Sequence, residues 1–283
     1  MGLGGYLTWT AAARAIRKVT GDNIKMLPVE QRGSFLKLIQ SPAFNYNPDF
    51  FTGESNAVAN QMLLPLVLNN PDANYCKNDT QRKAFHRYDK HIIEQICDCY
   101  GVKNPELKCI INLHDTEKIF AEDYHDCILK GEKYITIEPF SKDNYTPNRR
   151  YPLEKWQAIV DSLCNKIKII QVGNLGAPVL NNVINLTGDT SFREAIAVIE
   201  RSELFLATES GLVHAATAVD TKAVVIITGY QSEKMVAYPQ NINVNIASHG
   251  PCGLKVECPD CKKDANDHDW TKIASLVEKE LCL

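Results

Sequence analysis

The sequence predicts an α/β protein in which a parallel β-sheet is wrapped by helices. In the second half of the chain, strand-like apolar runs alternate with helix-like runs, and turn residues separate them. This alternation is typical of a parallel sheet with helical crossovers. Of the 283 residues, 45% are hydrophobic and 23% are charged, which provides an ample core. At roughly 150 residues per domain, the length predicts about two domains.

The first half of the chain is mixed in character. Gly4 and Gly5 lie in an opening glycine loop at 2–6 that is expected to lead into a helix N-terminus. A polar, aromatic loop follows at 41–56. The other elements expected here are a helix at 7–17, a strand at 23–28, and helices at 32–39, 57–68 and 81–100. The pattern specifies no strand order for this half.

The second half is predicted in more detail. A boundary at 130–133 divides the chain into an N-terminal domain, 1–130, and a C-terminal domain, 131–283. Strands are expected at 134–137, 167–172, 183–186, 204–207 and 223–228, and helices at 153–164, 191–200, 211–218 and 270–281. Ser191 and Ser210 precede two of these helices, where serine is a favoured N-cap residue.

Composition excludes several classes of protein. The formal net charge is −3, from 31 Lys and Arg against 34 Asp and Glu, so no general basic field would attract nucleic acid. No apolar stretch approaches the ~20 residues that cross a bilayer. The ten cysteines are too few for a disulfide scaffold, and no secretory signal precedes them. We therefore expect reduced thiols, a cytoplasmic location and unused sequons at Asn78, Asn144 and Asn185.

The most informative segment lies between an expected strand and helix at 207–216. Ligands of open parallel sheets bind beyond the carboxyl ends of the strands. Gly211 allows close approach to the backbone, the helix N-terminus offers N–H groups to an anion, and Ser210 adds a hydroxyl. Glu209 is placed to hold sugar hydroxyls, and His214 lies about one helical turn further on. Singly, these residues also fit an N-cap, a capping charge and a satisfied core histidine.

Two further clusters occupy strand-to-helix junctions. Arg149 and Arg150 are adjacent guanidinium groups, which suit phosphate oxygens as well as a solvated basic loop. Thr190, Ser191 and Phe192 follow Gly188 and Asp189, and this segment fits either the lining of a base or ribose pocket or a plain capped helix start.

These motifs together resemble one family. Residues 208–216 followed by 223–229 resemble the signature of glycosyltransferase family 9, the ADP-heptose lipopolysaccharide heptosyltransferases. The glycines at 2–5 before an Ala-rich helix look like the family's N-terminal glycine loop. Residues 149–152 are similar to its basic-x-aromatic-Pro motif, and 186–192 to its Gly-x-(Thr/Met)-Ser-Leu segment. The four matches keep the order of the family.

The resemblance implies a GT-B fold, with two Rossmann-like domains facing a cleft. The second domain would hold the nucleotide-sugar donor and the first the acceptor, with Gly4 and Gly5 in the acceptor and phosphate loop. The implied donor-binding residues are Arg149, Arg150, Thr190, Ser191, Phe192, Glu209, Ser210, Gly211 and His214. The implied reaction transfers a sugar, heptose or a related one, to an acceptor hydroxyl, and fixed donors rather than a metal stabilise the leaving diphosphate.

The chain departs from the family at several positions. The family's expected general base is an Asp that corresponds to Gly5, so the catalytic base is unknown. Another carboxylate or histidine takes this role, the acceptor differs, or transfer has been lost. Glu209 replaces an Asp, which lengthens the reach by one methylene. Because the chain starts directly at the glycine loop, we expect a truncated N-terminal domain without the family's opening strand.

A cysteine cluster lies near the end of the chain. Cys258 and Cys261 form a Cys-x2-Cys knuckle that presents two thiolates to one tetrahedral ion, and Cys252 offers a third ligand. The fourth ligand is ambiguous among His249, His268 and Cys282. Members of the family that modify autotransporters look to bind iron in such a cluster. A structural Zn or Fe is one interpretation, and free or partly buried thiols are the other.

The first functional hypothesis is a cytoplasmic glycosyltransferase of lipopolysaccharide biosynthesis that acts on a glycan, glycolipid or protein acceptor. It would need no cofactor for transfer and would lie in the cytoplasm or at the cytoplasmic face of the inner membrane. An alternative is a noncatalytic nucleotide-sugar-binding or assembly subunit, and a third is a GT-B epimerase. An incomplete first sheet would leave an open edge for pairing between copies, so an oligomer is also a hypothesis.

Overall fold

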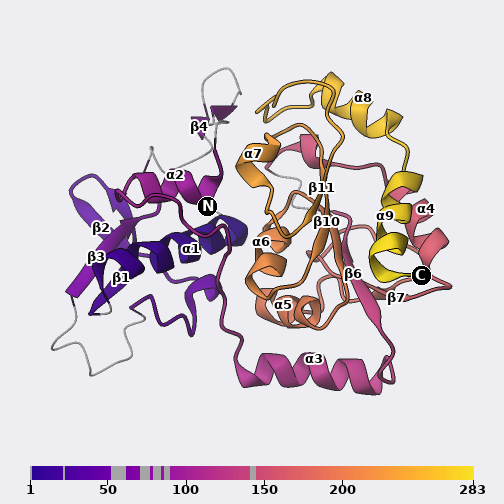
Figure 1. The fold of residues 1–283 in the computed structure, drawn as a ribbon, viewed down its shortest axis with the longest axis horizontal. Coiled ribbons are helices and arrows are strands. Elements are labelled where there is room, and N and C mark those ends of the chain that lie inside the picture. Colours follow the sequence, from indigo (N-terminus) through magenta and orange to yellow (C-terminus); the bar gives the residue numbers. More distant parts are fainter. Residues whose placement is uncertain are drawn as a thin grey trace.

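The computed structural model describes residues 2–21, 23–51, 62–70, 77–78, 84–85, 90–140 and 145–283. Two sheets, each with helices packed against it, stand beside one another (Figure 1). The first part of the chain forms the smaller sheet, and the last part forms the larger one. None of the described helices has the length and apolar character required to cross a membrane.

The smaller sheet has three strands in the order β2-β1-β3. β1 (Ile24–Arg32) pairs antiparallel with β2 (Phe35–Leu38) and parallel with β3 (Met62–Val67). α1 (Leu3–Thr20) and α2 (Ile92–Asp98) pack against each other beside it. The remaining elements here are the 3-10 turn η1 (Pro42–Phe44) and the paired strands β4 (Lys77–Asn78) and β5 (Ala84–Phe85).

Three expectations for this half were wrong. The helix expected at 32–39 is the hairpin strand β2, because Gly33 adopts a φ of 61° and reverses the chain. The described part of 57–68 is strand β3, and Pro65 within it would break a helix interior. The opening glycines are not a loop, since α1 already begins at Leu3. Of the helix expected at 81–100, α2 covers only 92–98, and residues 81–83 and 86–89 lie outside the described part.

The larger sheet confirms the pattern expected for the second half. Its six strands are all parallel and run in the order β11-β10-β9-β6-β7-β8. The strands are β6 (Tyr134–Glu138), β7 (Lys168–Gln171), β8 (Ile184–Asn185), β9 (Phe205–Thr208), β10 (Ala223–Ile227) and β11 (Ile242–Asn245). The expected helices are present as α4 (Leu153–Leu163), α5 (Phe192–Glu200), α6 (Gly211–Ala218) and α9 (Thr271–Leu281). β6, β9 and β10 are buried along their whole length.

Among the elements missed in the sequence are α3 (Asp115–Cys127), α7 (Glu233–Val236), β11 and α8 (Pro259–Asp267). α3 precedes the larger sheet and packs against α5 (Figure 1). Its His114 and Glu117 form a capping box, a signal that could have been read at the start of the helix. Because α3 lies before residue 131 but packs against α5 of the second part, the division at 130 stays a prediction.

Arg193 of α5 ties the two parts of the chain together. Its guanidinium is buried, forms an ion pair with Glu117 of α3, and donates to the backbone carbonyls of Pro42 and Asn112. It also lies over the ring of Tyr46, 5.3 Å from the centroid. Bidentate and charge-assisted bonds of this kind favour one relative position of the elements that they join.

A close approach between the two parts joins the first turns of α1 and α6. A Cβ added to Gly4 would collide with the Cα of Gly211 and would lie 3.2 Å from Cδ2 of His214. A Cβ on Gly211 would lie 3.3 Å from the Gly4 amide nitrogen. Two residues without side chains therefore allow two helix N-termini to meet.

Replacing Gly4 with Ala should destabilise the protein, because a methyl group would force α1 away from α6. The expected loss in the free energy of unfolding is about 1–3 kcal/mol, measured by denaturant titration. Gly2→Ser is the matched control, since nothing lies within 4 Å of a Cβ at Gly2 and serine is a favoured N-cap. Equal stability of the Gly4→Ala variant and the wild type would show that this contact does not constrain the fold.

Candidate functional site

The candidate site lies at the carboxyl ends of β6, β9 and β10, three adjacent strands of the larger sheet. These strands end at Glu138, Thr208 and Ile227, and the loops after them carry most of the predicted donor-binding residues. This edge is where open parallel sheets bind ligands. The fold therefore gathers the segments 145–150, 209–214 and 228–231 at one place.

Glu209 and Ser210 connect the ends of the three strands. Glu209 is buried, and its two carboxylate oxygens accept hydrogen bonds from the backbone N–H and the hydroxyl of Thr228, at 3.1 and 3.0 Å. The hydroxyl of Ser210 donates to Glu138 rather than capping α6. The N–H groups in the first turn of α6 thus receive no side-chain cap, as an anion site at a helix N-terminus requires.

Glu138 is a site residue that the sequence reasoning missed. It ends the otherwise apolar strand β6 and is 5% exposed. Its bond from Ser210 spans 72 positions of sequence, so no local pattern reveals the pair. A carboxylate that closes a buried parallel strand was the available signal, because such groups lie at the ligand-binding edge.

Arg149 supplies a guanidinium to the site. It ends the 3-10 turn η3 (Pro147–Arg149) and donates to the side-chain oxygen of Gln231 at 2.6 Å. Its guanidinium lies 5.1 Å from the ring centroids of both Tyr145 and Tyr230. This stacking fixes the plane of the guanidinium. Arg150, the next residue, is exposed.

The charges of the site oppose one another in a buried setting. Burial raises the pKa of Glu138 and of Glu209 to about 7, and the Arg149 guanidinium lowers both values in part. Burial lowers the pKa of His214 to about 3, helped by the nearby His91 and Arg149. At neutral pH the site thus contains a neutral imidazole, one guanidinium and two carboxyls that are partly protonated.

The remaining predicted residues lie at the start of α5. Ser191 and Glu194 form a capping box at the start of α5, with Ser191 accepting from the Glu194 N–H at 3.2 Å. Phe192 packs against the hydrophobic core. Among the described residues, no hydrogen bond joins Thr190 or Ser191 to Arg149 or Glu209. A role for the 190–192 segment in holding a nucleoside stays a prediction.

A Cys/His cluster, defined as His249, Cys252, Cys258 and Cys261, lies next to Asn148, the residue before Arg149. The ligand atoms of His249, Cys258 and Cys261 all lie within 4.8 Å of one another, and the Cys252 sulfur is 3.4 Å from that of Cys261. Three thiols and an imidazole fit a tetrahedral Zn or Fe site. A hydrogen bond from Cys261 lowers the pKa of the Cys252 thiol, which favours the thiolate form at that sulfur.

The structure distinguishes among the alternatives for a fourth ligand. The Nδ1 of His268 is 2.9 Å from the hydroxyl of Tyr151, and Cys282 ends α9 as an exposed residue. His249 is the candidate whose ring nitrogen faces Cys261, at 3.5 Å.

Asn148 links the Cys/His cluster to the candidate site. Its side-chain amide donates to the carbonyls of Leu254 and Val256, and its side-chain oxygen accepts from the N–H of Cys258 at 2.8 Å. Its own carbonyl lies 2.7 Å from the Thr228 hydroxyl, whose single proton is shared between this carbonyl and Oε1 of Glu209. Since Asn148 directly precedes Arg149, the cysteine loop, the arginine and the Glu209 partner form one connected unit.

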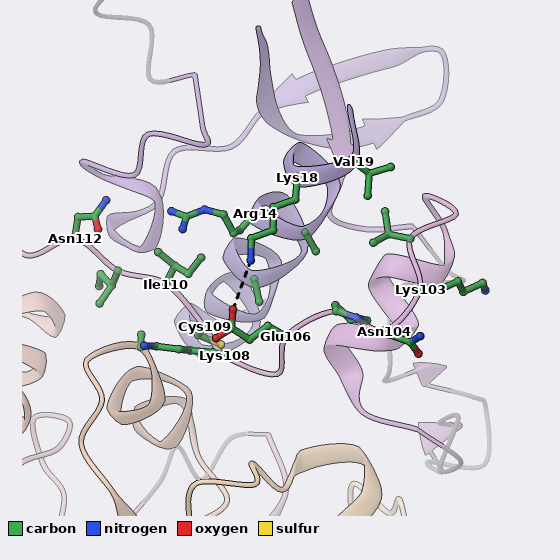
Figure 2. A pocket seen from close by; sticks show the side chains of 16 residues that line it. Arg14, Lys18, Val19, Lys103, Asn104, Glu106, Lys108, Cys109, Ile110 and Asn112 are labelled. Atoms are coloured by element: carbon green, nitrogen blue, oxygen red, sulfur yellow. Dashed lines mark ion pairs between the residues drawn. The ribbon is translucent and has the colours of Figure 1, made fainter. Parts of the chain in front are cut away.

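A pocket of about 600 Å³ lies elsewhere, along α1 and the segment 102–112 (Figure 2). Three of its cations form ion pairs with acidic residues outside its lining, namely Arg14 with Asp49, Lys103 with Asp98, and Lys108 with Asp220. Lys18 faces Glu106 across the pocket at 3.7 Å. These four cations are therefore compensated within the protein.

The Glu138 carboxyl should make stability depend on pH. Its folded-state pKa of about 7 lies above the ordinary value of 4.5, so the folded protein binds this proton more tightly than the unfolded chain. The stability gained in this way is complete below pH about 4.5 and is lost as pH rises through about 7. Glu138→Gln keeps an acceptor for Ser210 and removes this titration. The free energy of unfolding of Glu138→Gln, relative to that of the wild type, should therefore rise by on the order of 3 kcal/mol between pH 5 and pH 8.

The measurement is urea unfolding at several pH values, with exposed Glu154→Gln as the control. Parallel pH profiles for Glu138→Gln and the wild type would contradict the proposed burial of a titrating carboxyl.

Comparisons with solved structures agree with this fold. The chain is similar to a glycosyl transferase family 9 protein from Veillonella parvula, at 14% identity and a TM-score of 0.62, over 86% of this chain and 82% of that one. It is also similar to E. coli ADP-heptose LPS heptosyltransferase II, at 11% identity and a TM-score of 0.63, over 99% and 96% of the two chains.

A third similar structure is the dodecameric iron-containing heptosyltransferase TibC from enterotoxigenic E. coli, determined with ADP-D-beta-D-heptose. It is 13% identical with a TM-score of 0.63, over 99% of this chain and 74% of that one. No curated protein matches the chain. The similar structures confirm the expected GT-B fold.

The family model of glycosyltransferase family 9 (heptosyltransferase) matches residues 74–265. This match covers more than half of the chain and includes Arg149, Glu209, His214 and the Cys/His cluster. The resemblance inferred from the sequence motifs is thereby confirmed, and the chain belongs to glycosyltransferase family 9.

Proposed function

We propose that this protein transfers a sugar, heptose or a related one, from a nucleoside-diphosphate donor to a hydroxyl of a glycan, glycolipid or protein. One observation carries the proposal. The uncapped N-terminus of α6 and the stacked guanidinium of Arg149 lie at the same edge of the parallel sheet. Backbone N–H groups and a fixed guanidinium together suit a diphosphate.

The proposed chemistry follows from these groups. As the bond between sugar and diphosphate breaks, negative charge develops on the leaving diphosphate. Arg149 and the first turn of α6 would stabilise that charge without reorganising, which is the largest catalytic effect in many enzymes. Ser210 and Gly211 would lie along the diphosphate, as the family motif implies.

Proton transfer needs a different acceptor from the family's usual base, because Gly5 has no side chain and lies within α1. Glu138 suits this role, since its pKa of about 7 is close to the operating pH, as efficient general bases require. Glu209 suits it less, because both of its carboxylate oxygens are bonded to Thr228.

The donor can be identified by thermal shift with ADP, UDP, GDP and CDP. A ligand at a hundredfold its Kd adds about 2.7 kcal/mol of stability, which raises the Tm by roughly 5–10 °C for a protein of this size. Arg149→Ala should abolish this shift because it removes the cation that faces the diphosphate. Arg32→Ala, an exposed residue of β1, is the control. No shift with any of the four nucleotides would overturn the proposal.

The alternative, a noncatalytic nucleotide-sugar-binding or assembly subunit, is supported by Gly5 at the position of the usual base. A product assay with the donor found by thermal shift distinguishes the two functions. Transfer or donor hydrolysis supports the transferase, whereas binding with neither supports the subunit.

We further propose that the Cys/His cluster binds a structural Zn or Fe ion. The similar protein TibC contains iron, and here the four ligands fit one tetrahedral ion. When bound, the ion would cross-link 249–261 and hold the loop that Asn148 connects to Arg149. It would take no part in sugar transfer.

Metal analysis of the purified protein should find about one Zn or Fe per chain, as expected for a closed four-ligand site. Cys261→Ser should remove the ion and lower the Tm, because its sulfur contacts both Cys252 and His249. Cys282→Ser is the control, since Cys282 is exposed at the end of α9. A negligible metal content in the wild type would overturn this site.

A further inference from the structure

Tyr238 is a buried residue that connects His214 of the candidate site to the first part of the chain. Its hydroxyl lies 2.6 Å from Nδ1 of His214 and 3.2 Å from the sulfur of Cys109. Its ring also meets the ring of His91 edge-on, with centroids 4.8 Å apart. His91 caps α2, and Cys109 lines the pocket along α1. Two groups from before residue 131 thus surround a tyrosine that contacts the site histidine.

The hydrogen bonds around this hydroxyl have one preferred direction. Burial raises the pKa of the Cys109 thiol to about 12, so the sulfur keeps its proton and is a weak donor and weak acceptor. The imidazole nitrogen is a much better acceptor than the thiol. The order Cys109 S–H to Tyr238 O–H to His214 Nδ1 therefore gives every proton an acceptor. In the reverse order, the tyrosine proton would go to sulfur and the thiol proton would lose this acceptor.

This direction determines whether the other ring nitrogen of His214, Nε2, carries a proton. A neutral imidazole that accepts at Nδ1 carries its proton on Nε2. The low pKa of His214 keeps the ring neutral at physiological pH. Cδ2, the carbon bonded to Nε2, faces Gly4 at the contact between α1 and α6. The Nε2 side of the ring therefore lies where the two helix N-termini meet.

We propose that Tyr238 is a positioning residue that holds His214 in the Nε2–H tautomer, so that the histidine donates a hydrogen bond to the donor diphosphate. This inference rests on the proposed function for its ligand. The opposite tautomer would direct a lone pair at the anion and would weaken binding. Cys109 supports the arrangement because it donates to the hydroxyl from the segment that leads to α3.

A purely structural role for Tyr238 is the competing explanation. The ring is fully buried, and removing its hydroxyl could simply loosen the core. Tyr134→Phe is the matched control, because the Tyr134 hydroxyl is also buried and donates to the Val198 carbonyl at 2.7 Å, away from the candidate site. A tautomer measurement separates the two roles, since general loosening does not select one nitrogen.

The test is ¹⁵N NMR of histidine-labelled protein, with the His214 signals assigned through His214→Gln. In the wild type and in Tyr134→Phe, we expect a proton on Nε2 and none on Nδ1. In Tyr238→Phe, we expect both tautomers to be populated. The affinity for the nucleoside diphosphate from the thermal-shift screen should fall roughly three- to tenfold in Tyr238→Phe, the value of one hydrogen bond, and stay unchanged in Tyr134→Phe.

The outcomes separate this inference from the proposed function. A proton on Nδ1 in the wild type, or an unchanged single tautomer in Tyr238→Phe, overturns the role of Tyr238 whether or not a nucleotide binds. If no nucleoside diphosphate binds the wild type, the proposed function fails, and so does the role of the tautomer in binding. Should Tyr238→Phe fold poorly, Cys109→Ala provides a second variant, in which a smaller shift toward mixed tautomers is expected.

Discussion

The contact between Gly4 and Gly211 is the constraint on which the rest of the site depends. Because neither residue has a side chain, the first turns of α1 and α6 approach until their backbones touch. This approach brings the positive ends of two helix dipoles together. It also places the His214 ring against α1 and leaves the Tyr238 hydroxyl in reach of Cys109. A side chain at position 4 would separate all of these groups.

Behind this contact, the site is stiffened by a second set of bonds centred on Asn148. The residue joins the loop of the Cys/His cluster, the β10 end at Thr228 and the turn that carries Arg149. The loop of the Cys/His cluster also bonds to the segment after β10, since the N–H of Cys252 donates to the backbone carbonyl of Gly229 at 2.9 Å. Preorganised polar groups of this kind need little reorganisation when a charged ligand arrives. The cysteine loop therefore supports the site, although it contains none of the predicted donor-binding residues.

The sequence predicted the larger sheet well because its central strands are short, mostly apolar and wholly buried runs separated by turn residues. It predicted the smaller sheet poorly. β2 is exposed along its length and β3 contains Pro65, so neither shows the alternation that marks a strand. Arg149, Glu209, Ser210 and His214 were found through local motifs. Glu138, Asn148 and Tyr238 were missed, because their partners lie 24 to 129 positions away in sequence.

The substitution of Glu for Asp at position 209 has a physical consequence for the donor. The longer side chain turns inward and uses both oxygens to bind Thr228, so Glu209 fastens β9 to β10 instead of facing a sugar. Sugar selectivity would therefore come from side chains other than Glu209. Under the proposed function, Arg149 and the first turn of α6 would hold the diphosphate, and Glu209 would act by keeping the ends of β9 and β10 together.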